Sequence, residues 1–354
     1  MPARGKENLM TDMPSSHGSE FRGIFLSGLV LLALSLILIL FLNFYVFLRA
    51  PGPGPGQVAV RITVLPGMTF DQVAEILNEQ GIIRDVDMFR WLAMERDVIT
   101  RIQAGEFDLK AQMTPGEVLD RLVSGRPVEY KITIPEGYNL RQIAGILDQG
   151  EMWSGERFLD LASSPEFAKS IGIHAKTLEG YLFPDTYQFP RWAKEEDLIK
   201  TMVKRMKQVF GQQELARMQE LGMTMHELIT LASLIEKETS LPEERPLISS
   251  VFHQRIQRGI KLECDPTVIY GMPDFDGNLR RRDLEKWTPY NTYLNHGLPP
   301  GPIASPGKGS IHAALYPEES TYIYFVSRGD GTHVFSRTFA EHQEAIRRYQ
   351  LRRR

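Results

Sequence analysis

The stretch Ile229-Thr-Leu-Ala-Ser-Leu-Ile-Glu-Lys-Glu-Thr239 predicts a helix with a carboxylate on its apolar side. At about 100° per residue, one broad stripe gathers these apolar side chains: Leu228, Leu231, Ala232, Leu234 and Ile235. Glu238 lies three residues after Ile235 and four after Leu234, so it stays on the stripe. Lys237 points away from the stripe, and Glu236 lies near its far edge, where we expect it to reach water.

A carboxylate on an apolar face is costly unless it is paired, protonated or used in chemistry. Burial raises its pKa, which suits a general acid that works near neutral pH. The run alone leaves a second interpretation open, in which Glu238 is a structural, salt-bridged residue near a helix end.

The composition narrows the class of protein. A chain of 354 residues with 24% charged and 42% hydrophobic residues predicts two or three globular domains. The net charge of -3 gives no reason to expect nucleic acid as a partner. The single cysteine, Cys264, excludes an intramolecular disulfide. The segment from His226 to Thr230 approaches a zinc-protease motif, but Thr230 replaces the second His. We therefore predict no metal and no cofactor.

An uncharged run of 26 residues separates Arg22 from Arg49. About 20 apolar residues span a bilayer core as a helix, whereas the apolar part of a cleaved signal peptide is only ~7–15 residues long. Residues 23–48 are therefore predicted to be a single uncleaved transmembrane helix after a polar tail at 1–22. The basic residues of that tail favour a cytoplasmic N-terminus, with the rest of the chain outside the cytoplasm.

Alternating Pro and Gly at 51–56 predict a spacer, so residues 49–57 are expected to be a linker. Residues 58–128 then predict a small α+β module: strands at 58–64 and 105–109, helices at 70–80, 87–95 and 114–122. Residues 129–354 predict a larger mixed α/β domain, so the fold class is α+β.

Residues 63–77 align without gaps with residues 133–147, and both segments predict a strand, a glycine turn and a helix. Two copies are too few for a repeat array. Further on, a mostly helical region is broken at 178–187 by an aromatic and acidic segment with a central Pro. Aromatic rings beside a carboxylate are found in sugar sites and also in ordinary loop packing, and both interpretations stay open.

Five motifs follow one another along the chain: Glu179-Gly-Tyr-Leu-Phe-Pro-Asp185, Leu231-Ala-Ser-Leu-Ile-Glu-Lys-Glu-Thr239, Asp265-Pro-Thr-Val-Ile-Tyr-Gly271, Tyr290-Asn-Thr-Tyr293 and Gly297-Leu-Pro-Pro-Gly-Pro-Ile-Ala304. This series closely resembles the endolytic murein transglycosylases of the MltG (YceG-like) family over about residues 58–350. The resemblance implies a LysM-like module after the anchor and then a catalytic transglycosylase domain. It also implies that Glu238, the second Glu of the Glu-Lys-Glu-Thr run, is the catalytic residue.

The resemblance further implies a membrane-anchored lytic transglycosylase in the cell (inner) membrane, with its catalytic domain periplasmic or otherwise extracytoplasmic. Such an enzyme cuts MurNAc-GlcNAc β-1,4 bonds within nascent peptidoglycan strands, leaves 1,6-anhydro-MurNAc ends and so terminates strand elongation. Its partners would be glycan strands and peptidoglycan synthases (penicillin-binding proteins). Residues that could bind substrate or stabilise the transition state are Glu179, Tyr181, Asp185, Asp265, Tyr270, Asn291 and Tyr293.

Two other functions compete with this one. A hydrolytic muramidase would use Glu238 together with Asp185 or Asp265 to hold a water molecule. A non-enzymatic wall-binding scaffold would hold glycan through the small module and the aromatic loops. The mass of the product separates the two enzymes, because hydrolysis adds one water and the anhydro reaction adds none.

Overall fold

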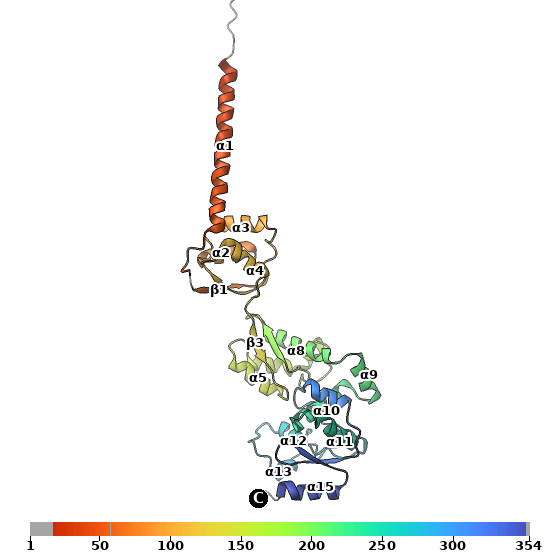
Figure 1. Cartoon of the computed structure of the whole chain (residues 1–354). Helices are drawn as coiled ribbons and strands as arrows, with labels where there is room; N and C mark the ends of the chain where they lie inside the picture. The colour runs from red at the N-terminus through yellow and green to blue at the C-terminus, as the bar shows by residue number, and fades with distance from the viewer. Residues whose placement is uncertain (1–16, 57, 352–354) are drawn as a thin grey trace, which may run out of the picture. The chain divides into compact units, whose positions relative to one another are not determined.

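The computed structural model describes residues 17–56 and 58–351, with side chains from Phe25 onward. The chain divides into two compact units, residues 1–129 and 130–354, whose elements are labelled in Figure 1. Within the described residues the strands form three antiparallel pairs, β1 with β2, β3 with β4 and β5 with β6. Helices outnumber strands in both units, so the predicted mixed α and β architecture is confirmed.

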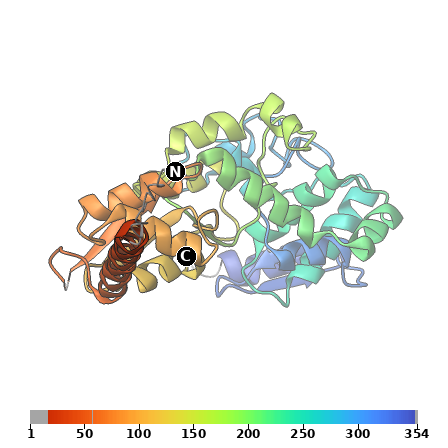
Figure 2. The ribbon, with the colours of Figure 1, turned by 90° about the horizontal axis from the view of Figure 1, so that it is seen from above.

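The first element, α1 (His17–Arg49), contains an apolar segment, Phe25–Arg49, that is long enough to cross a membrane. It starts at His17, so residues 17–22 of the expected tail are helical, and residues 1–16 lie outside the described residues. The last turns of α1 pack on the first unit, as seen in Figure 1 and Figure 2. Phe47 is buried there, and Phe44 and Leu48 flank it.

The Pro/Gly segment at 51–56 does not hold the first unit away from α1, as a free spacer would. The Gly52 N–H donates a hydrogen bond to the Ala111 carbonyl (2.6 Å), and the Gly54 N–H donates to the Gly81 carbonyl (3.0 Å). A Cβ atom on Gly52 would collide with the backbone at Gly81. Glycine therefore allows this segment to lie directly along the first unit.

The first unit is built on a two-stranded sheet, β1 (Ala59–Val64) and β2 (Gly105–Lys110). Two helices, α2 (Phe70–Glu79) and α3 (Val86–Glu95), connect the strands, and α4 (Pro115–Ser124) follows. The expected elements are confirmed, and Thr114 and Glu117 make a capping box at the start of α4. The largest fully buried side chains of this core include Phe89, Phe107, Ile62, Leu77, Leu92 and Leu109.

The two aligned segments, residues 63–77 and 133–147, both form a strand, a turn and a helix, as predicted. Gly67 and Gly137 both adopt positive φ angles, +86° and +74°, at the turns, where a residue with a side chain would be strained. Thr69 and Asn139 then cap the following helices with the same reciprocal hydrogen bonds.

The second unit opens with the second copy of this motif, and one of its elements differs from the sequence prediction. The segment at 178–187 runs into a strand that was not predicted, and this strand pairs with the first strand of the unit. The helical region after this strand begins with two helices, separated at Phe210 and Gly211. The elements are β3 (Tyr130–Thr133), α5 (Leu140–Gln149), α6 (Gly155–Ala162), α7 (Pro165–Ser170), β4 (Thr186–Phe189), α8 (Glu195–Val209) and α9 (Gln212–Glu220).

The helix of the opening stretch, α10 (Met225–Glu238), lies in the core of the second unit. Every residue from Leu228 to Ile235 is buried, so this part of the helix has no solvent-facing side. It packs against α11 (Arg245–Gln257) and α14 (Lys308–Leu315). The remaining elements are α12 (Asp265–Tyr270), α13 (Arg281–Leu284), the hairpin β5 (Tyr324–Ser327) and β6 (His333–Ser336), α15 (Phe339–Ile346) and a π-helical turn, Arg347–Leu351.

Candidate active site

Glu238 is the last residue of α10 and faces a cavity of about 400 Å³. The cavity lies between the end of α10, the start of α12, the β5–β6 hairpin and the C-terminal helix. Its polar lining residues are Glu238, Arg255, Glu263, Asp265, Tyr293, Ser327, His333, His342 and Gln350. Glu238 keeps some solvent exposure through this cavity, as a residue that meets substrate must.

Burial raises the pKa of Glu238 from its ordinary value of 4.5 to about 7. The hydrogen bond from Cys264 Sγ to Glu238 Oε2 (3.3 Å) works against this rise, the negative charge of Asp265 adds to it, and His333 opposes it. The C-terminal end of a helix also carries partial negative charge, which disfavours a second negative charge there. Near neutral pH the group is therefore balanced between acid and base, as general acid–base catalysis requires.

Of the residues that the sequence proposed as substrate contacts, two share this cavity with Glu238. Asp265 is the first residue of α12, and Tyr293 donates a hydrogen bond from its hydroxyl to Asp265 Oδ1 (2.7 Å). This bond fixes the direction of the Asp265 carboxylate, whose charge acts on Glu238. The pair places a fixed negative charge beside the acid.

The sequence analysis missed His333 and Glu244. Glu244 accepts two hydrogen bonds from His333, one from its backbone N–H (2.9 Å) and one from Nδ1 (2.7 Å). These bonds hold the imidazole at the cavity wall, where its side chain is only 8% exposed. The residues are 89 positions apart, and neither belongs to a quoted motif, so no local pattern in the sequence points to them.

The expectation that Glu236 reaches water is wrong. Its side chain is 6% exposed, lies 3.5 Å from Arg245 Nη2 and accepts a hydrogen bond from the Gly307 N–H (3.0 Å). Because α10 is buried on all sides at this level, the edge of its apolar stripe meets another helix instead of solvent. Lys237 does point away from the stripe, and it donates to the Gly137 carbonyl (3.1 Å).

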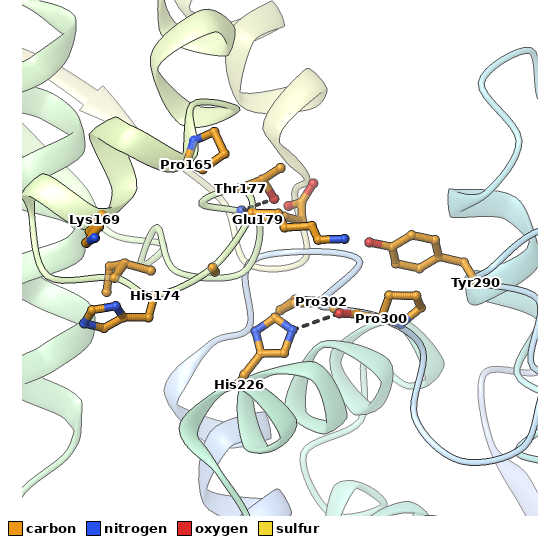
Figure 3. A pocket seen from close by; sticks show the side chains of 13 residues that line it. Pro165, Lys169, His174, Thr177, Glu179, His226, Tyr290, Pro300 and Pro302 are labelled. Carbon is orange, nitrogen blue, oxygen red and sulfur yellow. Dashed lines mark hydrogen bonds between the residues drawn. The ribbon is translucent and has the colours of Figure 1, made fainter.

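Glu179 and Tyr270, two other proposed contacts, lie together but away from the Glu238 cavity. Glu179 is 4% exposed, and its Oε2 accepts hydrogen bonds from the Leu140 N–H (3.2 Å) and the Tyr270 hydroxyl (3.0 Å). Burial raises its pKa to about 7, against the lowering effect of these bonds. Glu179 also lines a second cavity, of about 640 Å³, whose other walls include Tyr290 and Pro300 (Figure 3).

The remaining candidates are engaged in structural contacts. Tyr181 is 5% exposed, and its hydroxyl is bonded to His226 Nδ1 (2.8 Å). Asp185 pairs with Arg205 (2.9 Å) and does not line the Glu238 cavity.

Asn291 is fully buried. Its amide donates to the carbonyls of Leu284 (3.0 Å) and Lys286 (2.8 Å), and its Oδ1 accepts from the Tyr293 N–H (2.9 Å). It therefore shapes the loop that carries Tyr293, and its burial keeps it from contact with a ligand in the cavity.

Among the described residues no group of three or more His, Cys, Asp or Glu side chains could hold a metal ion. The Glu238 cavity has the parts of a general acid–base site built on one carboxyl group with a raised pKa. A fixed carboxylate and a fixed imidazole stand beside that group, within a mixed α/β fold.

Comparison with known proteins adds the family. The model of the YceG-like family matches residues 62–348, which is most of the chain. The endolytic murein transglycosylase of Bacillus subtilis is 32% identical over 312 residues, which cover 83% of this chain and 85% of the relative. The protein of the same name from Streptococcus pneumoniae is 29% identical over 76% of this chain and 54% of its own length.

A crystal structure of a YceG-like protein from Listeria monocytogenes has 30% sequence identity and a TM-score of 0.56. The match covers 81% of this chain and 99% of that one. The chain belongs to the YceG-like family, and its curated relatives are murein transglycosylases. The predicted family and the predicted class of enzyme are thereby confirmed.

Proposed function

We propose that this chain is a membrane-anchored endolytic murein transglycosylase in which Glu238 serves as both general acid and general base. The observation that carries the proposal is the pKa of Glu238, raised to about 7 in an accessible cavity. The substrate would be the MurNAc-GlcNAc β-1,4 bond inside peptidoglycan strands. The curated relatives' names and the family match support murein as the substrate.

In the first step protonated Glu238 gives its proton to the glycosidic oxygen, and the bond from that oxygen to C1 of MurNAc breaks. The positive charge that develops at C1 is stabilised by the ionised Asp265, whose orientation is fixed by Tyr293.

In the second step the C6 hydroxyl of the same sugar bonds to C1, and the Glu238 carboxylate takes up its proton. The 1,6-anhydro end forms, Glu238 returns to its acid form, and no water is consumed. One carboxyl group with a pKa near 7 can perform both transfers, because it is readily protonated and readily ionised at that pH.

His333 is proposed to set the electrostatics of this exchange. Held by Glu244, it remains at the cavity wall and favours the ionised state of Glu238, which Asp265 disfavours. Glu179, Tyr270 and Tyr181 are proposed to shape the surrounding substrate cleft through the contacts described above. Asp185 and Asn291 are proposed to support the loops around it.

The first unit is proposed to be the LysM-like module, because its two strands enclose two helices in a β–α–α–β order. It would bind glycan strands, and penicillin-binding synthases remain proposed partners. The apolar α1 supports a single-pass anchor in the cell membrane, with a cytoplasmic N-terminus and both units outside. Protease added to sealed spheroplasts would then degrade both units, and intact units would contradict this topology.

The test of the activity is digestion of purified glycan strands by the full-length protein, followed by mass spectrometry of the products. We expect products with anhydro ends, whose summed mass equals that of the uncut strand. Ends heavier by one water would identify a muramidase in which Asp265 holds the water, and uncut strands that stay bound would identify a scaffold.

A further inference from the structure

Within the first unit, α3 presents two large apolar side chains to the outside. Trp91 is 57% exposed and Met94 is 58% exposed, although α3 packs its opposite side into the core. The Trp91 ring stands edge-on to the Phe44 ring of α1, with centroids 4.8 Å apart. An exposed Trp attached to an apolar helix needs an explanation, because isolated soluble domains seldom form extended apolar patches.

Apolar hollows lie on both sides of the Trp91 ring. One, of about 440 Å³, is lined by Ile37, Leu40, Phe41, Phe44, Trp91 and Glu95. The other, of about 300 Å³, is lined by Leu40, Phe44, Asp87, Met88 and Trp91. Together they form the Trp91 groove, whose floor is α1. Among the described residues, the charged groups that line it are the carboxylates of Asp87 and Glu95.

The depth of the groove follows from the length of α1. The uncharged run of 26 residues is about 39 Å long as a helix, and the hydrocarbon core is about 30 Å thick. If the excess is shared between the two ends, the core ends near Tyr45. Phe44 then lies at the boundary between hydrocarbon and head groups, and Trp91 must lie at the same depth because it touches Phe44.

The described residues of the connection tie the first unit, and with it α3, to the end of α1. Phe47 is buried in the first unit, and the Pro/Gly segment is hydrogen-bonded along the same unit. Arg49 lies 3.9 Å from the centroid of the Tyr45 ring, which adds an aromatic and a basic group at the boundary. Trp and Tyr are the residues enriched at this depth in membrane proteins.

We propose that α3 is a second, interfacial membrane contact, in which Trp91 and the Trp91 groove hold the acyl and glycerol region of zwitterionic lipids. The inference rests on the proposed insertion of α1. Zwitterionic lipid is favoured over anionic lipid because the groove is edged by the carboxylates of Asp87 and Glu95. The first unit is therefore seated on the bilayer surface.

The experiment uses the full-length protein in phosphatidylcholine–phosphatidylethanolamine vesicles, with acyl chains brominated near the glycerol. Bromine quenches only Trp rings that reach the lipid. Flotation of the vesicles first shows whether α1 is inserted, so failure of the anchor is separated from failure of this inference. Quenching is then compared in wild-type protein, Trp91→Phe and Trp287→Phe.

Trp287 is the matched control, because it is 70% exposed and belongs to the second unit. We expect Trp91→Phe to remove most of the lipid-quenched fluorescence and Trp287→Phe to leave it unchanged. Equal quenching in floated wild-type and Trp91→Phe protein would overturn the proposal. The proposal would also be overturned if the quenching of Trp91 by brominated lipid fell as the protein-to-lipid ratio rose, because a second copy of the chain would then fill the groove.

Discussion

Replacement of Glu238 by Gln keeps the shape of the side chain and its capacity to accept the Cys264 hydrogen bond, but removes the transferable proton. General acid–base catalysis typically contributes ~10²–10⁴-fold, and in the proposed mechanism one group serves both steps. We therefore expect Glu238→Gln to lose at least ~10²-fold of the rate of anhydro-end formation. In the wild-type protein the rate should fall as pH rises through about 7, because the acid form of Glu238 starts the reaction.

The same substitution should stabilise the fold. Raising the pKa from 4.5 to about 7 means that the ionised form is disfavoured in the native state by about 3–4 kcal/mol, at about 1.4 kcal/mol per pKa unit. The native state binds more protons than the unfolded state between these pH values, so wild-type stability falls as pH rises through this window. Glu238→Gln should therefore melt higher than wild type above pH 7 and equally below about pH 4.5.

The assay combines mass spectrometry of digested glycan strands with thermal unfolding followed by circular dichroism, each at several pH values. A folded Glu238→Gln protein that loses less than ~10²-fold of the wild-type rate would refute the assignment of the acid. If the difference in melting temperature between Glu238→Gln and wild type were the same at every pH, the raised pKa of Glu238 would be refuted.

Three further predictions concern the surroundings of this residue. Glu236→Gln should lower stability by ~3–5 kcal/mol, because Arg245 loses a buried charged partner. The folded fraction of this variant should keep the wild-type rate per molecule. A stable but inactive variant would contradict the structural role of Glu236. Cys264→Ala should raise the pKa of Glu238 and move the basic limb of the pH–rate profile to higher pH. Cys264→Ser, a stronger donor, should move this limb to lower pH. Shifts in the same direction would contradict a role of this hydrogen bond in setting the pKa. The fragment 130–354 should still cut short glycan but bind long strands less tightly than both units together, and equal binding in a pull-down with insoluble peptidoglycan would show that the first unit is no glycan-binding aid.

Local pattern was sufficient for elements whose own residues determine them. The two glycine turns and the capped helices that follow were predictable, because Gly67 and Gly137 supply the positive φ angles and polar caps satisfy the first helical amides. The strand β4 was not predictable in this way. Its pairing with β3 joins residues more than 50 positions apart, and its sequence continues an aromatic loop.

Helical periodicity identified the side of α10 that carries Glu238, but it misjudged Glu236. The stripe argument assumes that one side of a helix meets solvent, whereas Arg245 of α11 and Gly307 at the start of α14 cover the other side of this one. The composition of the Pro/Gly segment predicted a spacer for a similar reason. The hydrogen bonds that hold Gly52 and Gly54 along the first unit depend on partners remote in sequence, which composition does not reveal.

The end of α10 also has a consequence for the order in which the protein folds. Glu236, Lys237 and Glu238 are each held by a different segment, at sequence separations of 71, 100 and 26 residues. The contact between His333 and Glu244 joins residues that are 89 positions apart. Contacts of such long range form slowly, since a large loop must close before any of them is made. We expect the Glu238 cavity to be complete only after synthesis has passed His333, so that a partly synthesised chain does not yet carry the proposed site.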